Sequence, residues 1–368
     1  NISALQLLAM ISRHNGNANM AAGIHNQIFA IDPLSHFIKA EQYLLNQNRN
    51  NADALNASIN NEYPDQTILE LAIDYHRRGD KDAANTLLSL NTKGANNPLL
   101  RLWSAKINNN TSLLSKPAEL DFIFPFRRET LRALEWATAQ NAHWSWSYLY
   151  SLNLWALNRE NEATEILYDL KDAPNHAPMY MVRGYFKEQQ NENAEHDLRR
   201  AVKLDSNSRI LHSFLIQYLQ RQEKWQTALE AGKKARARFS NDFNLELLHV
   251  KSLNNLGKAN EALEILSNIH VLPSENARES HILFEQAHAT AAMNAIDKGD
   301  YSTAINHLQS SMQWPEHLGL GKPYGPEQRL QEYLIAVAKV RQGEPKSDHI
   351  DQLNYKKKAI LNFRMAQV

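Results

Sequence analysis

An alanine recurs along this sequence at nearly constant spacing, and this periodicity constrains the fold more than any other feature. Ala194, Ala228 and Ala262 follow one another at equal intervals of about 34 residues. The interval is slightly shorter between Ala163 and Ala194 and clearly longer between Ala262 and Ala304. The chain is therefore predicted to be an irregular array of similar units, each of which must stack on its neighbours to bury its apolar surface.

Each unit has the pattern of two amphipathic helices joined by a tight turn. In one copy, Leu69, Ala72 and Tyr75 form the first apolar stripe, Gly79 ends it, and Ala84 lies in the second. Residues three and four positions apart share one face of a helix. This pattern, repeated with a period of about 34 residues, is that of the tetratricopeptide repeat. We therefore expect an all-α fold, an irregular, tetratricopeptide-like, right-handed solenoid of about eight to ten hairpins with extended plug loops.

Composition narrows the range of partners. The 368 residues contain 40 Lys plus Arg and 40 Asp plus Glu, which leaves no net charge to hold a polyanion such as nucleic acid. Cys is absent, which excludes disulfides, thiolate metal sites and cysteine nucleophiles. No stretch approaches the roughly 20 apolar residues that span a bilayer. A soluble protein is expected, in the cytoplasm or the periplasm.

Irregular segments divide the predicted array. We expect hairpins over 1–107, an extended plug over 108–130, repeats over 131–313, a Gly- and Pro-rich loop over 314–327 and capping helices over 328–368. The plug contains Phe124-Pro125-Phe126, which is too aromatic for a solvated linker and is predicted to be buried against the solenoid. Long loops without a helical pattern are uncommon and often functional. Lys356–Lys358 and Phe363 are predicted to lie on a last amphipathic helix that closes the open end.

Three phrases resemble a known family. Phe124–Thr130, Val271–Ala277 and Trp314–Pro323 are similar to the C-terminal tetratricopeptide half of bacterial proteins that carry domain of unknown function 5107. The resemblance covers nearly the whole chain and departs from the family at Ser274–Asn276. It implies an upstream β-rich region similar to sugar-binding sandwich folds, and an accessory or scaffold role near carbohydrate metabolism. It transfers no catalytic residues. Because the chain begins at Asn1 without a methionine, we expect it to be part of a longer protein.

Several residues could bind a ligand. Arg127, Arg128 and Glu129 could clamp a carboxylate or sugar hydroxyls through the guanidinium forks, or form a structural ion pair between the plug and the next helix. Trp144 could stack on a sugar or a peptide, or belong to the core together with Trp146. With three further basic residues, the candidate ligand-binding set is Arg127, Arg128, Glu129, Trp144, Arg183, Lys322 and Arg329.

Patterns for metal binding or catalysis are weak. His281, Glu285 and His288 share one helical face, but carboxylate metal sites need matching ligands from other helices, so a polar helix face is favoured. Lys322 follows two glycines but precedes Pro323 where a phosphate loop needs Ser or Thr. No Gly-x-Ser-x-Gly elbow is present. We therefore predict no catalytic residue, metal or cofactor in this chain.

Two functions remain open. The first is a non-catalytic binding or scaffold module whose concave face, formed by the first helix of each hairpin, holds a peptide, a partner domain or the missing upstream region. The second is the helical accessory half of a carbohydrate-active enzyme, which lends residues to a site completed by the upstream β-domain. Because no catalytic pattern is visible, the sequence favours the first function.

Overall fold

The structure is a computed structural model that describes residues 1–59, 64–90, 97–140, 142–273, 277–349 and 351. This described part contains 19 α-helices, three short 3-10 helices and no β-strand, which confirms the predicted all-α class. Its contacts divide into a first unit, Asn1–Asn175, and a second unit, His176–Val368. The predicted capping helix around Lys356–Lys358 and Phe363 lies outside the described residues.

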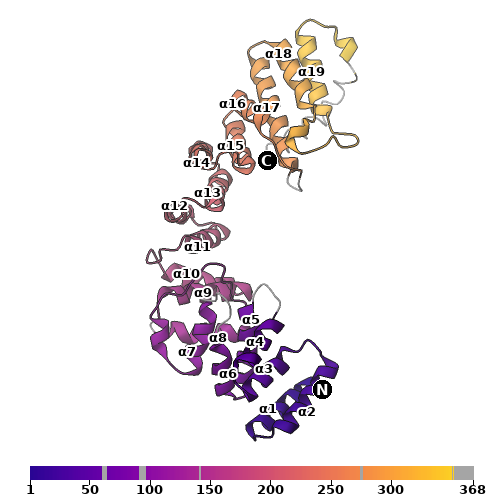
Figure 1. The fold of residues 1–368 in the computed structure, drawn as a ribbon. Coiled ribbons are helices and arrows are strands. Elements are labelled where there is room, and N and C mark those ends of the chain that lie inside the picture. The colour runs from indigo at the N-terminus through magenta and orange to yellow at the C-terminus, as the bar shows by residue number, and fades with distance from the viewer. Residues whose placement is uncertain (60–63, 91–96, 141, 274–276, 350, 352–368) are drawn as a thin grey trace. The chain divides into compact units, whose positions relative to one another are not determined.

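The first unit is a succession of helical hairpins (Figure 1). Helix pairs α1–α2, α3–α4, α5–α6 and α9–α10 pack together, and α8 packs on both α7 and α9. The helices are α1 (Ile2–His14), α2 (Ala18–Ile31), α3 (His36–Leu45), α4 (Arg49–Ser58), α5 (Pro64–Arg77), α6 (Lys81–Leu88), α7 (Pro98–Ile107), η1 (Thr111–Leu114), α8 (Arg128–Thr138), α9 (Trp144–Ala156) and α10 (Glu160–Asp169).

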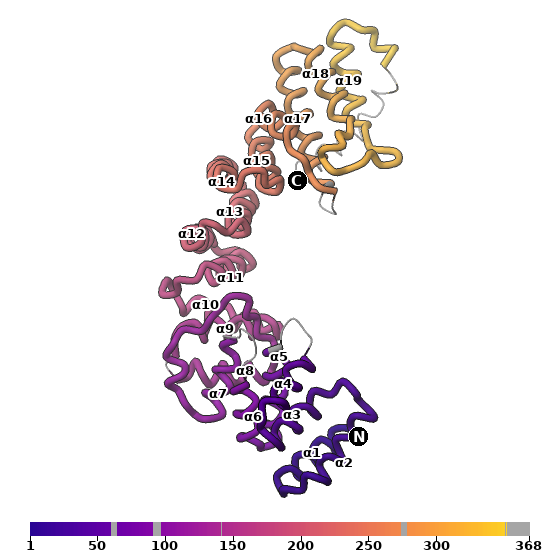
Figure 2. Tube along the Cα trace, viewed as in Figure 1, coloured from indigo at the N-terminus to yellow at the C-terminus, as the bar shows by residue number. Residues whose placement is uncertain are grey.

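The second unit continues the same pattern, and Figure 2 shows its hairpins following one another along the chain. Pairs α11–α12, α13–α14, α15–α16 and α17–α18 form the hairpins, and each second helix packs on the next first helix. The helices are α11 (Ala177–Gln189), α12 (Glu195–Leu204), α13 (Arg209–Arg221), α14 (Trp225–Arg238), α15 (Phe243–Asn255), α16 (Ala259–Asn268), α17 (Ala277–Asp297), α18 (Tyr301–Ser311), η2 (Glu316–Leu318), α19 (Arg329–Arg341) and η3 (Lys346–His349).

The recurring alanines are fully buried. All are 0% exposed, as expected for residues that let two helix backbones approach closely: Ala21, Ala84, Ala163, Ala194, Ala228, Ala262 and Ala304. Larger side chains such as Tyr75 and Tyr218 are buried beside them. The turns also follow from the sequence, because Gly79 adopts a positive φ that ends α5 and Asp80 then caps α6 by accepting from the Ala83 amide.

The 108–130 plug has single buried residues among exposed ones. Leu114 is buried, and its carbonyl accepts a 2.9 Å hydrogen bond from the indole of Trp146. Phe122 is 88% exposed and Phe124 is 69% exposed. The prediction that Phe124-Pro125-Phe126 is buried is therefore wrong for both rings, and only the proline is buried. Within the plug, Leu114 belongs to the core, beside Trp146.

The Gly- and Pro-rich segment 314–327 is anchored to the hairpin before it. The Val271 amide donates to the carbonyl of His317 over 2.8 Å, and the Ser280 hydroxyl donates to the carbonyl of Leu318 over 2.6 Å. Gly319 has a φ of 75°, and a Cβ there would lie 2.6 Å from the carbonyl oxygen of Val271. A side chain at position 319 would therefore push the segment away from the hairpin.

Candidate binding surfaces

The predicted Arg127, Arg128 and Glu129 lie where the plug enters α8. Arg127 pairs with Glu70 of α5, and Glu129 accepts from Arg77 of the same helix over 3.1 Å. The guanidinium of Arg127 also lies 4.8 Å from the centre of the Phe126 ring. Arg128 is exposed. The ion pairs join the plug to α5, an earlier helix, rather than to the helix that follows.

The two tryptophans of α9 have different environments. Trp146 is fully buried, and the guanidinium of Arg101 lies 5.2 Å from its ring centre. Trp144, the predicted ligand-binding residue, is half-buried at the start of the helix, with its ring centre 5.0 Å from that of His143. Trp146 therefore belongs to the core, while part of Trp144 remains accessible.

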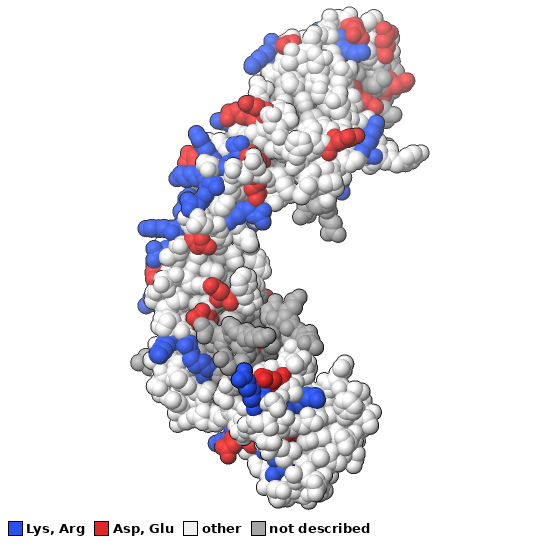
Figure 3. All heavy atoms as spheres, in the orientation of Figure 1, with Lys and Arg blue, Asp and Glu red and all other residues white. Residues whose placement is uncertain are grey.

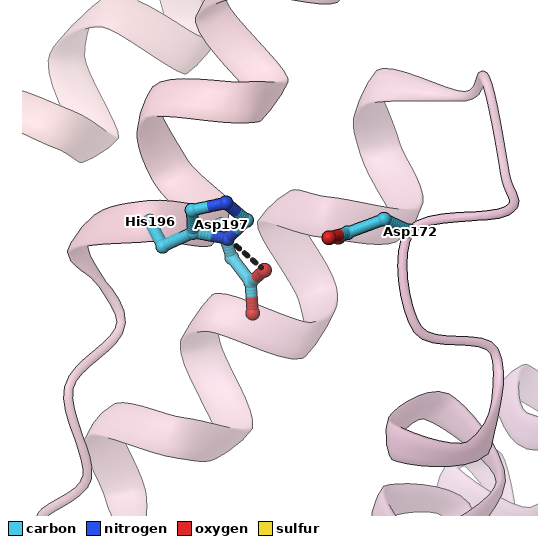
Figure 4. A group of neighbouring side chains, drawn as sticks. All are labelled: Asp172, His196 and Asp197. Carbon is cyan, nitrogen blue, oxygen red and sulfur yellow. Dashed lines mark ion pairs between the residues drawn. The ribbon is translucent and has the colours of Figure 1, made fainter.

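Arg183 of the second unit lies in a buried ionic cluster. It is 4% exposed and donates to both carboxylate oxygens of Asp197, over 3.0 and 2.7 Å. Lys187 contacts the same carboxylate over 2.9 Å. Figure 4 shows Asp197 beside His196; both belong to α12. The Nδ1 atom of His196 lies 3.5 Å from a carboxylate oxygen of Asp197. Asp172, also drawn, belongs to the first unit.

Burial of Asp197 alone would raise its pKa, but the hydrogen bonds from Arg183 and Lys187 outweigh this effect and lower it. The carboxylate therefore stays ionised near neutral pH. The guanidinium fork of Arg183 is engaged by this carboxylate.

The remaining predicted residues lie near the Gly- and Pro-rich segment. Lys322 is exposed within it. Arg329 begins α19 and pairs with Glu327. Both belong to the second unit, as does Arg183, whereas Arg127, Arg128, Glu129 and Trp144 belong to the first.

A groove of about 280 Å³ crosses the first helices of successive hairpins in the second unit. On α13, Ile210, which is 56% exposed, and Phe214 line it, and on α15 it is lined by Leu247. Two exposed side-chain amides, Gln217 and Asn244, lie among these apolar groups. We call this surface the first-helix groove.

The charged groups of the first-helix groove already have partners. Arg209 donates to Asp242 over 2.7 Å, and Glu279 lies 3.6 Å from Lys251. The surface that remains for a ligand is apolar, with uncharged amides that can both donate and accept hydrogen bonds.

A second pocket, of about 470 Å³, lies between α17, the end of α18, the 314–327 segment and α19. Trp314 forms one wall and stacks on His281 with ring centres 3.5 Å apart and planes 10° apart. His281 is itself held by a 3.1 Å contact between Nε2 and the Gln313 carbonyl. We call this cavity the Trp314 pocket.

The carboxylate of Glu285 lines the Trp314 pocket. One of its oxygens accepts a hydrogen bond from the amide of Gln331, a buried residue of α19. Burial raises the pKa of the Glu285 carboxyl above its usual value, against the opposing effect of this hydrogen bond.

His281, Glu285 and His288 do not converge on one point. His281 contacts Gln313, Glu285 contacts Gln331, and Nδ1 of His288 lies 3.0 Å from Nδ1 of His307 on α18. Each side chain of the shared helical face has its own partner.

Charges of both signs are interspersed on the face drawn in Figure 3, with basic side chains denser over α12 to α14. Many are paired within or between neighbouring helices, as in Arg221 with Glu188 and Lys224 with Glu195. None of the helices described in the structure has the length and apolar character needed to cross a bilayer.

Several solved structures are similar to this chain. A tetratricopeptide repeat protein from Parabacteroides merdae ATCC 43184 shares 13% identity, with a TM-score of 0.32 over 74% of this chain and 98% of its own. The type IV pilus biogenesis factor PilW shares 16% identity, with a TM-score of 0.33 over 56% of this chain and 90% of its own. The structure of the APC/C hetero-tetramer Cut9–Hcn1 has 13% identity and a TM-score of 0.30, over 98% of this chain and 87% of that one.

No protein-family model and no curated protein matches the sequence. With TM-scores below 0.5, the likenesses to solved structures assign no ligand or partner to this chain.

Proposed function

We propose that this chain is a non-catalytic binding module that holds a polypeptide segment, from another protein or from elsewhere in its own, in the first-helix groove. The observation that carries the proposal is the open apolar surface of Ile210 and Phe214 beside the amides of Gln217 and Asn244. An apolar side chain of a peptide would be buried against Ile210, while the two amides would pair with the peptide backbone.

The pairing of charges supports a ligand segment with little charge. Arg209 and Glu279 are neutralised by Asp242 and Lys251, so the groove gives no strong attraction to a charged chain. Burying a side chain such as that of Ile210 contributes on the order of 2 kcal/mol, enough for a loss of tenfold or more when it is replaced by a charge.

Selection from a display library of random short peptides tests this function. We expect the wild-type chain to enrich peptides that share apolar residues at a fixed spacing. Ile210→Glu should weaken binding of these peptides by about tenfold or more. The matched control is Leu272→Glu, which changes a residue of the same unit that is 68% exposed and lies outside the groove lining. Equal binding by the Ile210→Glu and wild-type chains would refute the proposal.

A further inference from the structure

The three buried carboxylates among the described residues are each accompanied by a cation. The buried Glu41, Asp80 and Asp197 each lie within 3.0 Å of an arginine nitrogen. Glu285 is half-buried, yet within the described residues its one hydrogen bond comes from the neutral amide of Gln331 and no ion pair reaches it. A carboxylate in a poorly solvated site without a countercharge is unfavourable.

The missing countercharge has room in the Trp314 pocket. The volume of about 470 Å³ exceeds what a single long side chain needs and falls in the usual range of ligand pockets. Apolar residues make up part of the pocket lining, namely Ile282, Met312, Trp314, Leu320, Pro323 and Pro326. Such walls fit an alkyl chain, and the face of an indole attracts a cation.

The pocket is held open by its own contacts. Stacking on His281 fixes the ring of Trp314, and the Gln328 amide donates to the Met312 carbonyl over 3.2 Å. The 314–327 segment is anchored through Leu318, which is fully buried. A ligand would therefore meet a cavity that already has its shape, which limits the entropic cost of binding.

We propose that the Trp314 pocket binds an alkylammonium or guanidinium group, the chemistry of a lysine or arginine side chain, with the cation paired to Glu285 and the alkyl chain against Trp314. Arg278 also lines the pocket and precedes Glu285 by seven residues on α17, about 10 Å along the helix axis, so the proposal requires the cation to lie at the Glu285 end of the pocket. The pocket shares no lining residue with the first-helix groove, so the two proposals are independent.

Saturation-transfer NMR on the full chain tests the proposal. The probes are N-acetyl-lysine methylamide and N-acetyl-arginine methylamide, and the control is N-acetyl-norleucine methylamide, which has a similar chain without the cation. We expect both cationic amides to bind at least tenfold more tightly than the norleucine amide. Equal binding of the norleucine and lysine amides by the wild-type chain would overturn the proposal.

Two substitutions on α17 give opposite results if the pairing is correct. Glu285→Gln keeps the size of the side chain and removes the charge, and it should weaken the lysine amide about tenfold or more. Arg278→Gln removes a positive charge from the same pocket and should leave binding unchanged or tighten it. Unaltered binding to Glu285→Gln would contradict the proposal. A circular-dichroism spectrum and a thermal unfolding midpoint equal to those of the wild-type chain would show that this variant is folded, whether or not the first-helix groove binds peptides.

The source of the cation is decided with two further probes. Tighter binding of a lysine-containing, blocked pentapeptide than of spermidine would indicate a polypeptide ligand. The reverse order would indicate a free amine with the same chemistry.

Discussion

Asp197 shows how this protein stabilises charge inside a helical array. Its carboxylate is fully buried on α12 and accepts from Arg183 and Lys187 of α11, so it fastens the two helices of one hairpin. In the first unit, Arg13 of α1 joins Glu41 of α3 to Asp80 at the start of α6. Each cluster therefore ties separate helices together through buried charges.

Removal of the Asp197 charge should destabilise the second unit strongly. Asp197→Asn leaves Arg183 buried without its countercharge, and we expect a loss of about 3 kcal/mol in the free energy of unfolding, measured by urea denaturation. Glu261→Gln, which removes the exposed partner of Lys258, is the control and should change little. A loss no larger than that of the control would show that the cluster contributes nothing to stability.

The contact between His288 and His307 predicts a dependence on acid. Burial, with a smaller contribution from His307, lowers the pKa of His288 to about 4. The unfolded chain therefore takes up a proton at His288 near the usual pKa of 6.5, before the folded chain does. The stabilising effect of the neutral ring is present above pH 6.5 and is lost as the pH falls from about 6.5 to about 4.

Titration of the His288 ring protons by NMR measures this pKa directly. We expect a midpoint near 4, together with a fall in the urea midpoint of the wild-type chain over the same pH range. A His288 midpoint at or above 6.5 would mean that the ring is solvated and that the contact with His307 does not persist.

The plug gives a test at the scale of an element, because it contains both buried and exposed apolar side chains. Leu114→Ala opens a cavity beside Trp146 and should cost about 2–5 kcal/mol, whereas Phe124→Ser replaces an exposed ring and should change stability by less than about 0.5 kcal/mol. Thermal unfolding of both variants measures the two losses of stability. Equal destabilisation by the two would place the ring of Phe124 in the core.

The sequence predicts features that depend on nearby residues better than features that depend on contacts between distant residues. The repeated alanines predicted buried positions, because each successive hairpin places the equivalent residue against its neighbours at the period of the array. The exposure of Phe124 was not predictable, since aromatic composition does not tell which positions the core can accept. The sequence patterns singled out His281, Glu285 and the 314–327 segment separately. Their arrangement around one pocket was not predictable, because the hydrogen bond from Gln331 to Glu285 joins residues 46 positions apart.

At the scale of the whole molecule, the contacts of the chain divide into two units at Asn175 and His176. The seven candidate residues selected from the sequence fall in both units, four in the first and three in the second. The first-helix groove and the Trp314 pocket both belong to the second unit. Sequence reasoning missed the groove, because Ile210 and Leu247 resemble ordinary core residues until the stacking of hairpins is known.

The central claim is that the first helices of the second unit form the binding surface. Hydrogen-exchange mass spectrometry of the full chain, with and without a peptide selected from the display library, tests it most directly. We predict slower exchange in α13 and α15, which carry Ile210 and Leu247, and unchanged exchange in α14 and α16. Protection confined to α14 and α16, or to the first unit, would contradict the claim.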